Sequence, residues 1–133
     1  MDVPLAVVAA WHDALNAGDG ERLAALSHPE VEVAGPRGIG RGVDILREWV
    51  ERAGIRLDPE RWFGRGDALV VLQRATWRSP ETGEPGEPQM VATAFRIGNG
   101  RVRRVARFER LDEALADADL DTSAELPMGA AES

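Results

Sequence analysis

The spacing of apolar residues changes once along this chain, from a helical period to a period of two. In the first fifty residues apolar positions recur every three or four residues, as at Val8, Trp11 and Leu15, which is typical of amphipathic helices. Between residues 55 and 110, apolar and polar residues largely alternate, as in half-buried strands. Helices followed by strands predict an α+β domain in which the helices cover one face of a curved antiparallel or mixed sheet.

Residues that favour helix ends and tight turns indicate where the helices and strands begin and end. Pro4 and Gly18 bound a first long helix, Asp19 can cap a second over residues 20–26, and Asn99-Gly100 predicts a type I′ hairpin. We expect a third helix over 43–53 and a closing helix over 111–120. The predicted strands cover residues 31–34, 55–57, 61–63, 68–78, 89–97 and 101–110.

The net charge of −7 comes from one end of the chain. From Asp112 onward there are seven acidic residues and no basic one, so residues 1–111 carry equal numbers of each. We expect a single domain over residues 1–120, whose first 111 residues are neutral overall, followed by an acidic, disordered tail over residues 121–133. The overall acidity says nothing about the charge of a binding site.

Several residue types are missing, and their absence excludes whole classes of chemistry. The chain has no Cys, Tyr or Lys, which removes thiolate nucleophiles, Schiff-base lysines and P-loop lysines. No serine stands in a Gly-x-Ser-x-Gly turn. The two histidines, His12 and His28, are too far apart for a zinc site without cysteines. We expect neither a metal nor a cofactor.

Location and macromolecular partners follow from what the sequence lacks. There is no apolar run of membrane-spanning length and no basic leader segment, so we expect a cytoplasmic protein that does not enter a membrane. The one basic strand, from Arg101 to Arg110, is interrupted by Glu109. This pattern favours a solvated or subunit-facing strand over a nucleic-acid interface.

Three stretches together resemble one family. They are residues 11–19 (WHDALNAGD), the turn over 35–42 (GPRGIGRG) that leads into a helix, and the hairpin over 98–108. In this order they resemble SnoaL-like proteins of the nuclear transport factor 2-like superfamily, over about residues 4–116. The resemblance implies a cone-shaped, cystatin-like domain whose sheet curls around the first helix and leaves a pocket open at one end.

The catalytic residues of two enzymes in that superfamily are not found here. The resemblance places Gly35 at the base position of ketosteroid isomerase, Trp11 at its tyrosine, and a position near Thr93 at its second aspartate. All three functional groups are missing, which excludes that chemistry. Hydrolysis of the limonene epoxide type is disfavoured because the chain has no Tyr and Arg74 has no acidic neighbour on its strand. The fold alone does not choose the function.

Aromatic and polar residues of the helices and strands form the candidate ligand site. We expect the tryptophans and Phe95 to line an apolar pocket, in which polar side chains orient the ligand; that these rings only fill the core stays open. Residues predicted to bind the ligand are Trp11, Trp49, Trp62, Gln73, Trp77, Thr93, Phe95 and Arg107.

Two residues are candidates for catalysis. His12 can reach a pocket beside the first helix as an acid or base, and Arg37 can line the mouth of a pocket. The alternatives are that His12 lies on the helix flank, near solvent or capped by a neighbour, and that Arg37 is a solvated loop residue. Glu32 alternates with valines, so it should point outward.

These observations predict a protein that binds a small apolar or aromatic molecule. Whether it also acts as a cyclase, isomerase or hydrolase stays open. The alternative is a non-catalytic dimeric interaction or scaffold domain, in which Arg101, Arg103 and Glu109 pack against a second copy. A homodimer is expected in either case.

Overall fold

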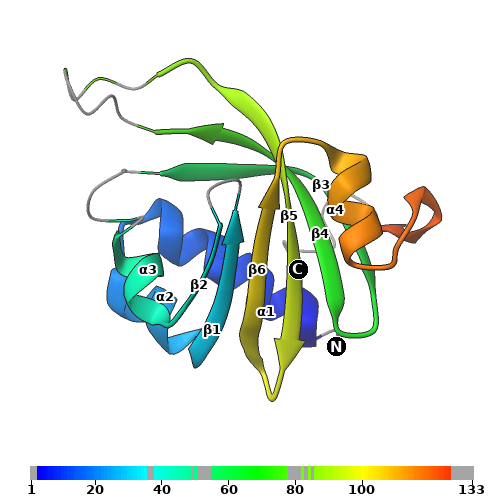
Figure 1. Cartoon of the computed structure of the whole chain (residues 1–133), viewed down its shortest axis with the longest axis horizontal. Coiled ribbons are helices and arrows are strands. Elements are labelled where there is room, and N and C mark those ends of the chain that lie inside the picture. Colours follow the sequence, from blue (N-terminus) through cyan, green and yellow to red (C-terminus); the bar gives the residue numbers. More distant parts are fainter. Residues whose placement is uncertain are drawn as a thin grey trace.

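A computed structural model describes residues 3–35, 38–48, 50, 55–77, 82, 84 and 86–126. The first half contains three helices and two strands before a long third strand, and the second half is mostly strand (Figure 1). The helices are α1 (Val3–Asn16), α2 (Gly20–Ala25), α3 (Val43–Glu48), α4 (Leu111–Asp117) and the short 3₁₀-helix η2 (Thr122–Ala124). The strands are β1 (Ser27–Gly35), β2 (Gly38–Arg41), β3 (Arg56–Arg65), β4 (Ala68–Thr76), β5 (Gln89–Gly98), β6 (Arg101–Phe108) and β7 (Glu125–Leu126).

The seven strands that the described residues form make one mixed sheet in the order β2-β1-β6-β5-β4-β3-β7. Neighbouring strands are antiparallel except β1 and β6, which run parallel. Asn99 and Gly100 have φ angles of 54° and 74°, as the predicted type I′ hairpin requires. Irregular pairing within β3 and between β5 and β6 adds curvature, because a bulge bends the strand that carries it.

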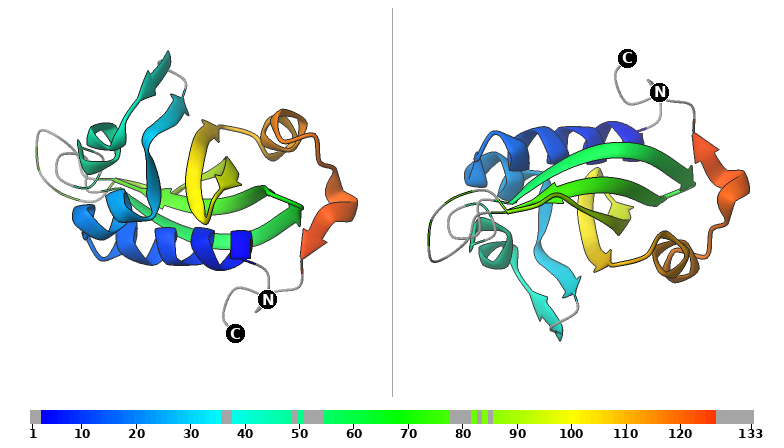
Figure 2. Two further views of the ribbon diagram at one scale, coloured as in Figure 1. Left: turned by 90° about the horizontal axis from the view of Figure 1, so that it is seen from below. Right: turned by 90° about the horizontal axis from the view of Figure 1, so that it is seen from above.

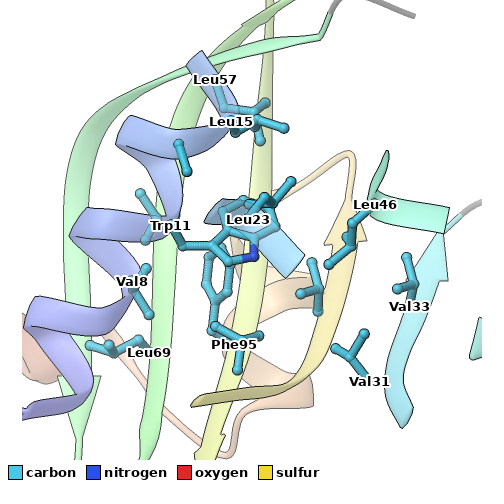
Figure 3. Close-up of a cluster of buried hydrophobic side chains, with 14 of the residues drawn as sticks. Val8, Trp11, Leu15, Leu23, Val31, Val33, Leu46, Leu57, Leu69 and Phe95 are labelled. Carbon is cyan, nitrogen blue, oxygen red and sulfur yellow. The ribbon is translucent and has the colours of Figure 1, made fainter. Parts of the chain in front are cut away.

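The N-terminal helices cover the inner face of this sheet, with α1 lying lengthwise along the strands (Figure 2). The apolar residues that recur on α1 meet apolar residues of β4, β5, β6 and β1 in one core, and Trp11 lies in its middle (Figure 3). Asp19 caps α2 by accepting a hydrogen bond from the backbone N–H of Arg22, at 3.0 Å. The predicted α+β architecture, with N-terminal helices on a strongly curved mixed sheet, is confirmed.

The outer face of the sheet is also buried, which differs from the expectation that the helices cover one face. Helix α4 packs across β5, β6 and β4 on the side opposite α1 (Figure 2). The strands present small residues there, including Ala92, Ala94 and Ala106, which pack with Ala114 and Leu115 of α4. Because alanine side chains are short, a helix can lie close to the sheet over them.

The C-terminal boundary of the domain differs from the prediction. Residues 122–126 form η2 and β7, and β7 pairs with β3 through the positions Trp62–Leu126 and Phe63–Glu125. The guanidinium of Arg61 donates two hydrogen bonds to the Glu125 carboxylate, each of 2.8 Å. The fold therefore continues to Leu126, and the rest of the predicted tail, residues 127–133, lies outside the described residues.

Other elements differ in extent. The two segments predicted at 55–57 and 61–63 are one bulged strand, β3, and the first strand begins earlier, at Ser27. Residues 51–54, which end the predicted third helix, lie outside the described residues. In the part of the chain that the structure describes, no helix is long and apolar enough to span a membrane.

Candidate functional site

His12 lies inside the core, where α1 faces the sheet. Its side chain is only 2% exposed, so the residue is not on a solvent-facing flank. The Nδ1 atom lies 2.8 Å from the carbonyl oxygen of Val8, one helical turn earlier. Since a carbonyl can only accept, Nδ1 carries the proton and Nε2 keeps a free lone pair.

A chain of hydrogen bonds continues from His12 into the sheet. The amide nitrogen of Gln73 lies 2.7 Å from His12 Nε2 and donates to it. The Thr93 hydroxyl donates in turn to the Gln73 amide oxygen, also at 2.7 Å. Gln73 and Thr93 are 0% and 1% exposed. Each donor has one acceptor, so the tautomer of His12 fixes the direction of the whole chain, and the Thr93 oxygen can only accept a further hydrogen bond.

Burial keeps His12 neutral. Loss of hydration lowers the pKa of His12 to about 4, against the opposing effects of the Val8 carbonyl and the charges of Asp13 and Asp58. A proton on Nε2 would also face the N–H of Gln73, which is a second donor. With both ring nitrogens engaged inside the protein, His12 is placed to orient Gln73 rather than to exchange a proton with a bound molecule.

Three of the predicted pocket-lining rings surround His12 within the core. The Trp11 ring meets the Phe95 ring edge-on, with centroids 5.1 Å apart, and the Trp62 ring lies 5.5 Å from the His12 ring. Trp11, Trp62 and Phe95 are all buried. These contacts place the three rings in the core cluster, as the core-filling alternative describes.

Two other predicted residues lie at the end of the inner face. The side chains of Trp77 and Arg107 are half-buried, and the guanidinium carbon of Arg107 lies 5.9 Å from the centroid of the Trp77 ring. This is within the range of a cation–π contact. Arg107 is also directly opposite Thr93 in the pairing of β5 and β6, so the buried polar chain ends beside this arginine.

A cleft of about 330 Å³ opens next to Arg107. It lies at the carboxyl ends of β1 and β6, which meet at one end of the sheet because the two strands are parallel. A Cβ atom built onto Gly35 would meet nothing within 4 Å, so the strand leaves open space at this position. The lining residues are Ala34, Gly35, Arg107, Phe108, Glu109 and Glu113.

The candidate site is therefore a partly apolar cleft at the end of the sheet, where Ala34 and Phe108 belong to the outer-face cluster. The buried polar row runs from Thr93 through Gln73 to His12 on the inner face, and Arg107 is the cross-strand partner of Thr93. Arg107 stands beside Glu109 and Glu113 in the cleft, so these lining residues carry no excess positive charge. Among the described residues there is no group of three His, Cys, Asp or Glu side chains that could hold a metal ion.

Of the residues predicted to bind a ligand, Arg107 lines the cleft and Trp77 contacts Arg107, whereas Thr93 and Gln73 lie in the buried row. Phe108, Glu113 and the open space at Gly35 were not predicted. The alternation Val31-Glu32-Val33-Ala34-Gly35 places Gly35 on the inner face with the two valines, and this signal could have indicated it. Trp49 and Arg37 lie outside the described residues. Glu32 points outward, as predicted, and accepts a hydrogen bond from Arg104 at 2.7 Å.

Solved structures with this arrangement define the fold class as nuclear transport factor 2-like. A protein of this class from Burkholderia pseudomallei superposes with a TM-score of 0.70 at 19% identity, covering 89% of this chain and 98% of that one. TerC, co-crystallised with polyporic acid, superposes with a TM-score of 0.70 at 18% identity, covering 88% of this chain and 98% of TerC. A protein from Sinorhizobium meliloti that is provisionally named a polyketide cyclase superposes with a TM-score of 0.65 at 27% identity, covering 76% of this chain and 92% of that one.

The family follows from the sequence match. The SnoaL-like domain model matches residues 8–105, which is most of the chain. The protein belongs to the SnoaL-like domain family, and the resemblance seen in the sequence is confirmed. No curated protein matches the chain.

Proposed function

We propose that this protein binds a small, neutral, oxygen-bearing aromatic molecule in the cleft at the carboxyl ends of β1 and β6. The observation that carries the proposal is the cleft itself, in which Arg107 stands beside the apolar side chains of Phe108 and Ala34. A concave site with apolar surface and a few polar groups that orient the ligand is typical of small-molecule binding.

The cleft favours a neutral ligand over an anion. Arg107 can donate hydrogen bonds to a carbonyl or hydroxyl oxygen, and it holds its guanidinium over the face of Trp77. Glu109 and Glu113 line the same cleft and would repel a carboxylate. Phe108 and Ala34 supply apolar surface for an aromatic ring.

Binding is proposed here without a catalytic step assigned to His12. A general base should have a pKa near the working pH and reach the substrate, whereas the pKa of His12 is lowered to about 4 and both its ring nitrogens are engaged. Two solved relatives are provisionally named a polyketide cyclase and a ketosteroid isomerase. A cyclase or isomerase step, other than that of ketosteroid isomerase, would extend the proposal and would take place among the side chains that line the cleft.

A thermal-shift experiment with 2-naphthol and 2-naphthoic acid tests the proposal. We expect 2-naphthol to raise the melting temperature, since a ligand at about 100 times its dissociation constant adds roughly 2.7 kcal/mol to the free energy of unfolding. The carboxylate analogue should give a smaller rise at the same concentration. A larger rise with the acid would overturn the choice of a neutral ligand.

Two substitutions locate the binding. Gly35→Leu should abolish the rise by filling the cleft, because Gly35 has open space beside it and no positive φ angle. Arg107→Gln should weaken it. Arg96→Gln is the matched control, since Arg96 lies on the adjacent strand but pairs with Asp67 at the surface, at 3.4 Å. A rise that persists in the Gly35→Leu protein would place the ligand elsewhere.

The dimeric scaffold is the second candidate. Arg101 and Arg103 are exposed on β6, and Ile39 on the edge strand β2 is 71% exposed, so this part of the outer surface can meet a second copy. Helix α4 already covers the outer face over β5 and β4. Light scattering on the wild-type protein and on Arg103→Glu tests it: loss of a dimer in the variant supports pairing here, and an unchanged dimer excludes it.

A further inference from the structure

A second pocket, of about 260 Å³, lies toward the amino ends of β1 and β6. These two strands are parallel neighbours (Figure 1), so their amino ends meet at one end of the sheet and their carboxyl ends, with the cleft, at the other. No residue is shared between the linings of the pocket and the cleft. The residues that line this pocket are His28, Glu30, Glu32, Arg41, Arg103 and Arg104.

Irregular strand pairing shapes the pocket around Arg103. Between the paired positions of Ser27 and Glu32, residues 28–31 of β1 stand opposite Arg103 alone. Arg103 is also passed over in the pairing of β6 with β5, where the register shifts. A bulge of this kind re-aims the side chain that it carries, and bulges occur more often than expected beside functional sites. Both neighbours of β6 are therefore irregular at the same residue.

Gly98 of β5 gives the Arg103 side chain its room. A Cβ atom built onto Gly98 would collide with Cδ of Arg103 and would lie 3.1 Å from its Cγ. The arginine side chain thus lies across the backbone of this glycine. A glycine inside a strand is typical of such a close approach. The bulge and the glycine together fix where Arg103 can point.

The pocket offers hydrogen-bond donors that the protein itself does not use. No described residue forms a hydrogen bond or ion pair with the Arg103 guanidinium. The Nδ1 atom of His28 accepts a hydrogen bond from the backbone N–H of Glu30, at 3.1 Å, so the neutral ring carries its proton on Nε2 and can donate it. Arg41 lies 3.9 Å from the Glu32 carboxylate, which is too long for a hydrogen bond.

The charges in this pocket favour an anion, in contrast to those of the cleft. Three arginines stand among two glutamates, and the Glu32 carboxylate already accepts a hydrogen bond from Arg104, at 2.7 Å. Arg41 and Arg103 then remain against Glu30, whose side chain is exposed. Guanidinium groups match the oxygen atoms of a phosphate in geometry and charge, and clusters of arginine are a common means of recognising phosphate groups.

We propose that this pocket binds a phosphate group, either as free phosphate or as the monoester of a small molecule. Arg103 donates to its oxygen atoms from β6, Arg41 from β2, and Nε2 of His28 from β1. A phosphate has three or more acceptor oxygen atoms, so it can serve donors from three strands, whereas a carboxylate has only two. This site is separate from the cleft, and the inference does not depend on the proposed function.

Titration calorimetry with inorganic phosphate, at an ionic strength held constant with chloride, tests the proposal. Arg103→Gln should weaken phosphate binding at least about tenfold, because hydrogen bonds between charged partners are lost. Arg101→Gln is the matched control, since it removes the same charge from the same strand but Arg101 does not line this pocket. The control protein should bind phosphate as the wild-type protein does.

Gly98→Ala separates geometry from charge. The added methyl group displaces the Arg103 side chain and leaves every charge in place, so phosphate binding should weaken in this variant too. A spectroscopic readout is available because the chain has only two histidines. Phosphate should move the ring resonances of His28 in the NMR spectrum, whereas those of His12, which is 2% exposed, should stay in place.

Phenyl phosphate distinguishes the two sources of the phosphate group. Tighter binding of phenyl phosphate than of inorganic phosphate identifies an organic monoester as the ligand, and equal or weaker binding identifies free phosphate. The proposal is overturned if neither compound binds, or if Arg101→Gln weakens binding as much as Arg103→Gln does, which would indicate unspecific attraction of charge. Binding that neither responds to Gly98→Ala nor moves the His28 resonances would place the phosphate elsewhere and also overturn it.

Discussion

Three polar side chains, those of His12, Gln73 and Thr93, lie in the middle of an otherwise apolar core. They are tolerated because each hydrogen bond has one donor and one acceptor in a consistent direction. The arrangement depends on one tautomer of a neutral imidazole. A single added proton on His12 would therefore disturb the orientation of both partners.

The stability of the fold should fall between about pH 6.5 and pH 4 because of His12. The pKa of this residue is about 4 in the folded protein and 6.5 when unfolded, so the unfolded chain takes up the proton first as the pH falls. The stability contributed by the neutral residue is complete above pH 6.5 and lost below about pH 4. The difference corresponds to roughly 3 kcal/mol.

Urea unfolding of the wild-type protein and of His12→Gln, at pH 7.5 and 4.5, measures this effect. The variant should be less stable at pH 7.5, because glutamine does not reproduce the packing of the ring. Between pH 7.5 and pH 4.5, the free energy of unfolding of the variant should fall by roughly 2–3 kcal/mol less than that of the wild-type protein. Equal pH dependence in the two proteins would show that His12 is not the buried neutral group described here.

At the scale of elements, Arg104 joins three segments that are distant in sequence. Its guanidinium, on β6, donates to Glu32 of β1 and to Asp117 of α4, and these acidic partners raise the pKa of Arg104 still further. The contact fastens α4 to the outer face of the sheet. The first turn of the same helix carries Glu113, which lines the cleft.

Arg104→Gln should lower the free energy of unfolding by about 1–2 kcal/mol, because three charged hydrogen bonds to two partly buried carboxylates are lost. Arg56→Gln is the control: Arg56 pairs with Asp58 at the surface, and removing an exposed pair should change stability by at most about 0.5 kcal/mol. The urea midpoints of the two variants, compared with that of the wild-type protein, measure these losses of stability. Equal losses would mean that the Arg104 contacts contribute no more than a surface pair.

The sequence predicted most elements, since their signals are local. The turn at Asn99-Gly100, the cap at Asp19 and the alternation on β4 and β5 depend only on neighbouring residues. The burial of the outer face was missed because it depends on α4 folding back over alanines, and alanine fits an exposed strand position as readily as a buried one. The pairing of β7 with β3 was missed because two residues carry too little periodicity to indicate a strand.

For the molecule as a whole, the described fold extends from α1 to Leu126. A chain truncated after Leu120 should lose roughly 2 kcal/mol of stability, because it lacks buried Ala124 and the β7 ladder. The exposed pair of Arg61 with Glu125 is lost as well. A chain truncated after Leu126 keeps all of these contacts and serves as the control. If the two truncated proteins melt at the same temperature, residues 121–126 contribute nothing to the fold.

The candidate site was harder to predict than the fold, for a physical reason. A tryptophan that lines a pocket and one that fills a core show the same helical or alternating spacing, so Trp11 and Trp77 could not be distinguished before the structure placed one in the core and the other beside Arg107. His12 and Gln73 are joined by a hydrogen bond although they lie 61 residues apart in the sequence. No local pattern encodes a contact of that range.

The parallel pairing of β1 with β6 has a consequence for how the chain folds. Glu32 and Arg104, which meet across this pair, are 72 residues apart, whereas β3 to β6 form a meander of antiparallel neighbours. Loop closure over such a separation costs more entropy than closing a hairpin, so we expect the meander to assemble first and β1 to dock on β6 last. The cleft, which lies between the ends of these two strands, is then the final feature to form. A folding chain therefore cannot bind a ligand there before β1 has paired with β6.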